Sequence, residues 1–318
     1  MTANCESTGS WLAGYIPDLP TPFHADGTID WAALRSSCRR QLAAGAPALV
    51  VAETAGEAST LTLAEHRAVI DAAVKQVGDR LAVVAGASSN STAHAIELAR
   101  QAEAAGADAL IAVVPYYNKP MQSGISAHFR AIADATGLPI ILHDVPSRTV
   151  RGIADETVAE LATSPRFIGL KDGTCDLARP LRLRSLVRPG FRLLAGDDAA
   201  VLGYLAQGGD GCISQVVNVA PAACHRVYLE WRHGRPNAAA SMLAGLAPLA
   251  ALLAEDGAPA ALKYVLSLEG LMSPTLRRPL VELPEPSRAA ARRVMEALRQ
   301  VGMTDSPVRA LDLVSRRF

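Results

Sequence analysis

One pattern repeats eight times along most of this 318-residue chain: a short apolar run, a polar loop, and a stretch with the periodicity of a helix. The apolar runs do not alternate with polar residues, so each predicts a strand that is buried on both faces. Strands of this kind, each followed by a helix, form a parallel sheet covered by helices. Eight such units predict an α/β fold of the (β/α)8 or TIM barrel class.

The predicted strands lie within residues 12–23, 46–53, 81–88, 109–117, 139–145, 167–173, 191–198 and 211–218. The helices between them are predicted at 29–45, 63–78, 91–106, 124–137, 154–164, 177–187, 199–208 and 220–234. Four of these helices end in a glycine that can take the left-handed conformation, namely Gly45, Gly78, Gly106 and Gly137. A doubly wound open sheet is the alternative fold, but the sequence has neither a GxGxxG after the first run nor a Walker-type loop.

The barrel is expected to end near Gly234. Residues 237–255, 258–270 and 287–302 predict three further helices with alanine-rich faces suited to close packing. We therefore expect a catalytic barrel at residues 1–234 and a C-terminal helical annex at 235–318 that could serve subunit contacts. The longest apolar stretch, 242–254, is interrupted by Pro248 and is too short to span a bilayer.

Charge and cysteine usage argue against several classes of protein. The formal net charge is zero, so no global field attracts nucleic acid or an anionic membrane surface. Arg179, Arg182, Arg184 and Arg188 are expected to form a solvated helix face. The five cysteines, Cys5 among them, have no CxxC spacing, which argues against a disulfide framework or a zinc knuckle. Without a cationic N-terminal leader, a soluble cytoplasmic protein is expected.

Lys171 is one of only four lysines, and it lies at the end of the apolar run 167–173. Burial disfavours an ammonium and lowers its pKa. A pKa of about 7–8 would enlarge the reactive amine fraction at neutral pH by roughly a thousandfold, as a lysine that forms Schiff bases requires. Alternatively, Lys171 extends out of the strand end or pairs with Asp172.

The active site of a TIM barrel lies at the carboxyl ends of its strands, so the informative residues are those where each apolar run stops. They supply one amine, hydroxyls, an imidazole and an arginine, with no metal-ligand set. The segments are Glu53-Thr54-Ala55-Gly56-Glu57, Pro115-Tyr116-Tyr117-Asn118, His143-Asp144-Val145-Pro146-Ser147-Arg148-Thr149, Lys171-Asp172, Gly196-Asp197-Asp198 and Ser214-Gln215.

This set suits a carbonyl substrate that carries a carboxylate. The amine attacks the carbonyl, hydroxyls and the imidazole move protons, and the arginine or backbone N–H groups hold the carboxylate. Each residue also has a structural alternative. Tyr117 could be an interfacial aromatic, His143 a hydrogen-bonded core residue, Arg148 a loop cap and Gly196 part of a turn.

In this order the segments resemble the dihydrodipicolinate synthase and N-acetylneuraminate lyase family of class I, pyruvate-dependent aldolases. The resemblance runs from about residue 14 to 283. Six segments carry it: Thr54-Ala55-Gly56-Glu57, Pro115-Tyr116-Tyr117-Asn118-Lys119-Pro120, Val145-Pro146-Ser147-Arg148-Thr149, Gly169-Leu170-Lys171-Asp172, Ala195-Gly196-Asp197-Asp198 and Asn218-Val219-Ala220-Pro221. It implies that Lys171 forms the Schiff base with pyruvate and that no cofactor is needed.

The resemblance also implies roles for other residues. Thr54 would relay protons, the Ala55 and Gly56 amides would hold the pyruvate carboxylate, and Tyr117 would complete the relay from a neighbouring subunit. Arg148 is typical of the synthase branch, where it holds the carboxylate of aspartate semialdehyde. Gly196 and Ser214 complete the expected substrate-binding set. The Tyr117 role implies a homotetramer built as a dimer of dimers.

Four positions depart from the synthase pattern. His143 stands where the family usually has the tyrosine that acts as general acid/base, and Asp144 stands in place of asparagine. Ala55 replaces the second threonine and removes a side-chain donor to the substrate carboxylate. Glu53 replaces a glycine, which puts a carboxylate beside the pocket or between strand and helix. The second substrate could therefore differ from aspartate semialdehyde.

The leading hypothesis is a Schiff-base lyase or synthase that joins a 2-oxo acid to an aldehyde. A second hypothesis, motivated by His143 and Ala55, is an aldolase, dehydratase or deaminase acting on a 2-keto-3-deoxy sugar acid or a related 2-oxo acid. A third is a 2-oxo acid binding protein whose proton relay has decayed. A metal-dependent aldolase ranks below all three, because no cluster has ligand spacing.

Overall fold

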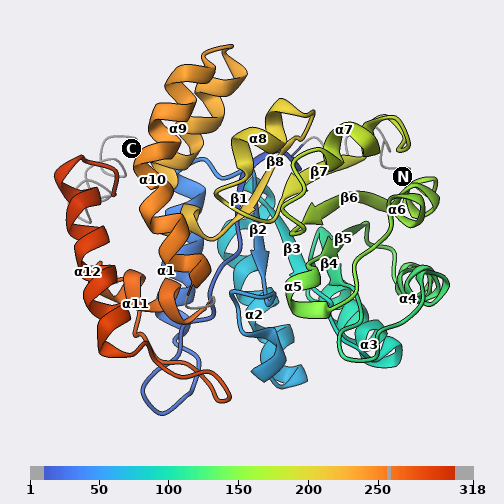
Figure 1. Ribbon diagram of the computed structural model, residues 1–318. Helices are drawn as coiled ribbons and strands as arrows, with labels where there is room; N and C mark the ends of the chain where they lie inside the picture. The colour runs from blue at the N-terminus through green and yellow to red at the C-terminus, as the bar shows by residue number, and fades with distance from the viewer. Residues whose placement is uncertain (1–10, 256–258, 305–318) are drawn as a thin grey trace.

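A computed structural model of the protein describes residues 11–255 and 259–304. Its centre is a sheet of eight parallel strands in the order β1-β8-β7-β6-β5-β4-β3-β2 (Figure 1). The strands are β1 (Gly14–Pro17), β2 (Ala48–Val51), β3 (Ala82–Gly86), β4 (Ala109–Val113), β5 (Ile140–Asp144), β6 (Phe167–Asp172), β7 (Arg192–Ala195) and β8 (Gly211–Ser214). A parallel bridge between Asp18 and Val50 joins β1 to β2, so the sheet closes into the expected TIM barrel.

Helices follow the strands and surround the barrel. They are α1 (Trp31–Ala43), α2 (Leu63–Val77), α3 (Thr92–Ala104), α4 (Gln122–Ala135), α5 (Pro146–Thr149), α6 (Asp155–Ala162), α7 (Arg179–Arg184), α8 (Val201–Ala206) and α9 (Pro221–Arg232). Short 3-10 helices lie at η1 (Ala58–Thr60), η2 (Gly78–Arg80) and η3 (Val216–Asn218). The predicted order of strands and helices is thus confirmed.

Local sequence signals explain where the helices begin and end. Asp30 accepts hydrogen bonds from the first amides of α1, and Thr62 forms a capping box with Glu65 at the start of α2. Gly45 follows α1 with a φ of 83°, as predicted. The same prediction is wrong for Gly137, whose φ is not positive. Its N–H instead donates to Glu103 Oε1 at 2.7 Å, an approach that a Cβ would obstruct.

The barrel interior is a packed apolar core, as is usual for this fold. Its side chains come from alternate positions of the strands and include Ile16, Val50, Val84, Ile111, Ile141, Leu194 and Ile213. The opposite faces of the strands pack against the surrounding helices and form a second, larger core. Because apolar side chains fill the barrel below its mouth, polar groups gather where the strands end.

Three helices form the predicted C-terminal annex: α10 (Pro236–Glu255), α11 (Ala260–Leu268) and α12 (Glu285–Gln300). Figure 1 shows them beside α9, and α10 contacts both α9 and α12. Buried side chains of the annex and of the barrel helices belong to one continuous cluster. The division into two domains at residue 234 stays a prediction.

Pro248 lies inside α10, as the single helix predicted at 237–255 requires. The apolar segment is longer than the predicted stretch 242–254, because it reaches back to Pro236, and its 19 residues have a mean hydropathy of 1.6. By length and composition alone this segment could cross a membrane, and about a third of it is buried against the rest of the chain. In the structure it packs as an annex helix against α9 and α12.

Candidate active site

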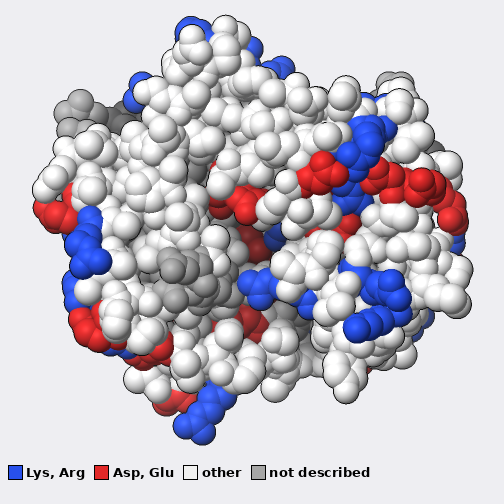
Figure 2. Space-filling model, viewed as in Figure 1, with Lys and Arg blue, Asp and Glu red and all other residues white. Residues whose placement is uncertain are grey.

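The carboxyl ends of the strands bring the predicted nucleophile and the predicted imidazole together. Lys171 on β6 and His143 on β5 are register partners, and their relative exposures are only 5% and 3%. They lie two residues beyond Ile141 and its partner Gly169, so the pleat directs both side chains into the barrel. Figure 2 shows a recess near the centre of this face of the molecule, with acidic and basic side chains inside it.

Lys171 is flanked by two buried carboxylates. Its Nζ lies 3.3 Å from Asp18 Oδ2 and 3.6 Å from Glu53 Oε2. Burial lowers the pKa of Lys171, but the charges of Glu53 and Asp18 outweigh burial and raise that pKa above its usual value. The expectation of a lowered lysine pKa is therefore wrong for the free enzyme, in which Lys171 is an ammonium.

Neither alternative for Lys171 holds. Its side chain is buried rather than extended into solvent, and its partners are not the neighbouring Asp172. Asp172 instead accepts hydrogen bonds from Arg179 and from the hydroxyl of Tyr204 at 3.1 Å each. Lys171 and Asp172 point to opposite faces of β6, which explains why they have separate partners.

Glu53 connects the imidazole to the amine. His143 Nδ1 lies 3.0 Å from Glu53 Oε1, and the Thr54 amide donates to Glu53 Oε2. The Glu53 side chain therefore points into the site rather than between strand and helix. Burial opposes its ionisation, but Lys171 and then His143 outweigh burial and hold the pKa of Glu53 well below its usual range. Burial, reinforced by Lys171, lowers the pKa of His143, so the ring is neutral at neutral pH.

Asp18 is a site residue that the sequence reasoning missed. Its carboxylate follows β1 and is completely buried, and burial raises its pKa to about 7 despite the nearby ammonium of Lys171. The sequence contained a signal for Asp18, because a charged residue within the first apolar run directly follows the residues that form β1. Asp18 was missed because the apolar run extends to residue 23, which placed the predicted end of the strand five residues beyond Asp18.

The segment from Thr54 to Glu57 forms the turn after β2. Ala55 is completely buried, and the carbonyl of Gly56 accepts a hydrogen bond from Thr21 Oγ1 at 2.7 Å. Glu57 is buried as well and forms an ion pair with Lys263 of α11. The predicted carboxylate-binding turn is thus attached to both the first loop of the barrel and the annex.

Two predicted residues lie on the surface of the chain. Tyr117 is 88% exposed, and its φ of 70° is in the left-handed region. A strained backbone that displays an aromatic side chain to solvent is compatible with a contact to another copy, but within one chain Tyr117 is not part of the Lys171 cluster. Arg148 is exposed on α5, close enough for its charge to lower the pKa of His143.

Gly196 and Ser214 both have roles within the fold. The Gly196 amide donates to the Asp172 carbonyl at 2.7 Å, and a Cβ at this position would lie only 3.1 Å from that oxygen. The Ser214 hydroxyl donates to the Asp198 carboxylate and accepts from the Val217 amide at 3.0 Å. Their contribution to substrate binding stays a prediction.

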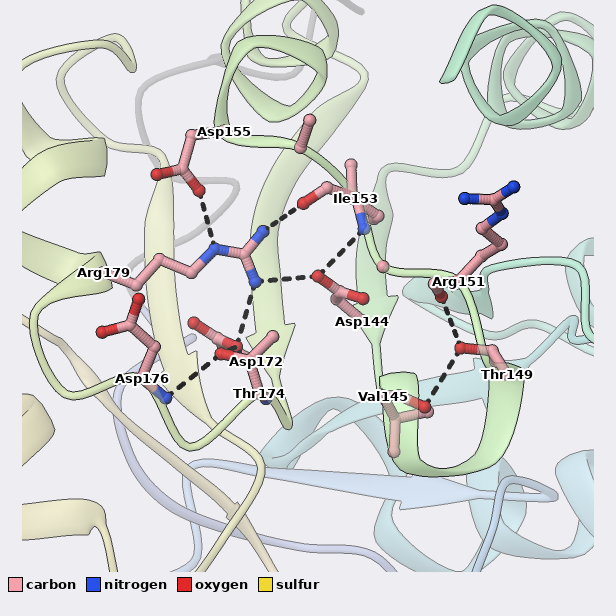
Figure 3. Close-up of polar contacts among 12 residues, drawn as sticks. Asp144, Val145, Thr149, Arg151, Ile153, Asp155, Asp172, Thr174, Asp176 and Arg179 are labelled. Carbon is pink, nitrogen blue, oxygen red and sulfur yellow. Dashed lines mark hydrogen bonds and ion pairs between the residues drawn. The ribbon is translucent and has the colours of Figure 1, made fainter. Parts of the chain in front are cut away.

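A buried arginine supports the strand ends from outside the barrel. Arg179 Nη1 lies 2.8 Å from Asp144 and 3.1 Å from Asp172, and its Nε lies 2.9 Å from Asp155 (Figure 3). Asp144 and Asp172 directly follow His143 and Lys171 in the chain. The expectation of a solvated arginine face is wrong for Arg179, which is 3% exposed because these carboxylates compensate its burial.

Comparison with known proteins identifies the family to which this chain belongs. A family model described as the dihydrodipicolinate synthetase family matches residues 11–298. The chain belongs to this family. It is 43% identical over 296 residues to a 4-hydroxy-tetrahydrodipicolinate synthase of Gluconobacter oxydans, covering 93% of this chain and 99% of that protein. It is 45% identical over 298 residues to the enzyme of the same name from Methylobacterium radiotolerans, covering 94% of this chain and 98% of that protein.

Solved structures of the family agree. A chloride-inhibited dihydrodipicolinate synthase from Acinetobacter baumannii, complexed with pyruvate, is 35% identical, with a TM-score of 0.87 over 92% of this chain and 99% of that one. The dihydrodipicolinate synthase from Aquifex aeolicus is 32% identical, with the same TM-score and the same coverage. The resemblance read from the sequence motifs is confirmed.

Membership in the dihydrodipicolinate synthetase family makes this chain an enzyme, a lyase of the class I aldolase type. Enzymes of the family work without a cofactor. Within residues 11–255 and 259–304, no three His, Cys, Asp or Glu side chains are grouped so as to hold a metal ion. The described cysteines, Cys38, Cys175, Cys212 and Cys224, are free thiols, whereas Cys5 lies outside the described residues.

Proposed function

We propose that this enzyme forms a Schiff base between Lys171 and pyruvate or a related 2-oxo acid, and that the resulting enamine adds to an aldehyde such as aspartate semialdehyde. The observation that carries the proposal is a buried amine at the mouth of the barrel beside a neutral imidazole. The names of the relatives and the pyruvate complex of a solved one support this choice of substrates.

The first step requires an uncharged amine. Lys171 therefore passes a proton to a neighbouring base before its nitrogen attacks the 2-oxo carbon. His143 is its neutral register partner, and Thr54 lies in the turn after Glu53, so these two residues are assigned to proton transfer. The backbone amides of Ala55 and Gly56 are assigned to the pyruvate carboxylate.

The remaining predicted residues are assigned to the second substrate and to the assembly. Arg148 is exposed near the site, where its guanidinium suits the carboxylate of an incoming aldehyde. Gly196, just past β7, and Ser214, at the end of β8, are assigned to substrate binding. Tyr117 is assigned to the site of a neighbouring subunit in a cytoplasmic homotetramer built as a dimer of dimers. Its exposure in the single chain supports this assignment.

The contact between Glu53 and His143 favours one second candidate. An imidazole is a stronger base than a phenol at neutral pH and suits proton abstraction from a larger 2-oxo acid. An aldolase, dehydratase or deaminase acting on a 2-keto-3-deoxy sugar acid would use the same Lys171 chemistry.

Steady-state kinetics on a substrate panel separate the two candidates. The panel contains pyruvate with aspartate semialdehyde, pyruvate with aldehydes that lack a carboxylate, and 2-keto-3-deoxy sugar acids alone. The proposal expects the highest kcat/KM for pyruvate with aspartate semialdehyde. Preferred turnover of a sugar acid without an added aldehyde would reject it in favour of the second candidate.

A further inference from the structure

Glu53 divides its carboxylate between two different groups of the site. One oxygen lies 3.0 Å from Nδ1 of His143, and the other lies 3.6 Å from Nζ of Lys171. All three side chains are almost completely buried, at 3%, 4% and 6% exposure. A buried carboxylate that contacts both a ring nitrogen and the nucleophile is well placed to control proton transfer between them.

We propose that Glu53 is a positioning residue for proton transfer at Lys171. Its carboxylate holds the His143 imidazole with the proton on Nδ1, which leaves Nε2 as the base for a C3 proton of the lysine-bound 2-oxo acid. This inference rests on the proposed Schiff base and adds to it the group that fixes the tautomer of the base.

The tautomer follows from hydrogen-bond chemistry. An ionised carboxylate only accepts hydrogen bonds, so the ring nitrogen that contacts it must carry the proton. In a neutral ring the other nitrogen then has a free electron pair. Burial and the neighbouring ammonium keep the His143 ring neutral, while the same ammonium keeps Glu53 ionised. The two groups are therefore in complementary protonation states.

Nε2 of His143 takes a proton from C3 of the iminium, and the C3–H electron pair becomes the C2=C3 double bond. The C2=N electron pair moves to the nitrogen of Lys171, which loses its positive charge. The products are a neutral enamine and an imidazolium whose Nδ1–H faces the Glu53 carboxylate, which stabilises the charge that has moved to the ring.

Other charged groups face the same cluster. Asp18, just past β1, contacts the amine of Lys171, whereas Glu53 contacts both that amine and the ring. Arg148 of α5 and Lys171 of β6 both disfavour the imidazolium. Cys212 of β8 is buried near Lys171. Glu53 is thus the carboxylate that holds the ring, and Asp18 is a matched carboxylate beside the amine.

The test separates iminium formation from the C3 proton transfer. Borohydride trapping with pyruvate, read by intact mass, measures the iminium. Exchange of the pyruvate methyl protons in D2O, followed by NMR, measures the C3 step and needs no second substrate. Glu53→Gln keeps the size of the side chain and removes its charge. Asp18→Asn does the same for the other carboxylate.

We expect the ratio of exchange rate to trapped iminium to fall at least about tenfold in Glu53→Gln and to stay within about threefold in Asp18→Asn. Loss of either charge lowers the pKa of Lys171, so the pH midpoint of trapping should move down in both variants. An unchanged ratio in Glu53→Gln, or an equal fall in both variants, would overturn the inference. Absence of any iminium in the unmodified enzyme would instead reject the proposed function.

A measurement on the unmodified enzyme keeps the inference testable if Glu53→Gln fails to fold. In a long-range proton–nitrogen NMR spectrum of enzyme labelled at histidine, His143 should be the Nδ1–H tautomer near neutral pH. The spectrum of His143→Gln assigns the signal. A ring protonated on Nε2 alone would refute the inference, whatever the variant does.

Discussion

The buried ion pair between Glu57 and Lys263 is expected to be important for the stability of the fold. Both side chains are completely buried, with relative exposures of 0%. Besides Glu57, the Lys263 ammonium contacts the Thr275 carbonyl at 3.0 Å and the Phe23 ring, whose centre is 4.0 Å away. The second oxygen of Glu57 accepts from the Arg277 amide at 3.0 Å. This pair therefore joins the turn after β2, which is predicted to bind the substrate carboxylate, to the annex.

Glu57→Gln removes the charge and leaves the ammonium buried without its counterion. Breaking a buried pair in this way costs about 3–5 kcal/mol, more than a surface pair would. Burial already lowers the pKa of Lys263 to about 8 against the effect of Glu57, and without Glu57 this pKa falls further. Between the lower Lys263 pKa of the variant and about 8, native Glu57→Gln has released the Lys263 proton that the unmodified native protein retains. The loss of unfolding free energy caused by Glu57→Gln should therefore shrink as the pH rises toward about 8.

Urea unfolding followed by circular dichroism, at one protein concentration, measures the loss. The double variant Glu57→Gln with Lys263→Met is the control, because it removes the unpaired ammonium. We expect it to be at least about 2 kcal/mol more stable than Glu57→Gln alone. A single-variant loss under about 1 kcal/mol, or a double variant less stable than the single one, would refute the reasoning.

Three further predictions concern other parts of the site. Arg179→Leu leaves Asp144 and Asp172 buried without their cation and should cost about 3–5 kcal/mol in the same urea assay, whereas a loss under about 1 kcal/mol would contradict the burial argument. Arg148→Ala should raise the KM for an aldehyde with a carboxylate about 10- to 100-fold and leave the KM for pyruvate within about twofold. Equal effects on both KM values in steady-state kinetics would show that Arg148 does not bind the aldehyde carboxylate. Burial raises the pKa of Asp18 to about 7, so native Asp18 retains a proton that the unfolded chain releases near pH 4. The unmodified protein should therefore lose unfolding free energy relative to Asp18→Asn as the pH rises from about 4 to about 7. A pH-independent difference in unfolding free energy would count against that last assignment.

The architecture could be predicted because its signals are local. Each strand is a short apolar run, and capping residues such as Asp30 and Thr62 mark where helices begin. An error arose where a tertiary contact replaced a local preference. Gly137 does not adopt the predicted left-handed conformation, and its N–H donates to the Glu103 side chain instead.

The electrostatics of the site could not be predicted in the same way. Burial alone lowers the pKa of a lysine, but Lys171 also contacts Asp18, whose charge raises that pKa. The two residues are 153 positions apart in the sequence, and only the closed barrel brings them together. Arg179 likewise lies in a basic stretch that predicts a solvated face, until the barrel places Asp144 and Asp172 beside it. Motif order predicts Lys171 as the nucleophile, a role that stays a prediction, whereas the protonation state of Lys171 depends on partners that the motifs do not contain.

The proposed reaction requires a covalent bond between Lys171 and the 2-oxo acid. Borohydride reduction in the presence of pyruvate, followed by peptide mass spectrometry, locates that bond. We expect one reduced pyruvate on the peptide that contains Lys171 and none in Lys171→Ala. Modification of Lys75, Lys119 or Lys263 instead, or no modification in an enzyme that still turns over pyruvate, would contradict it.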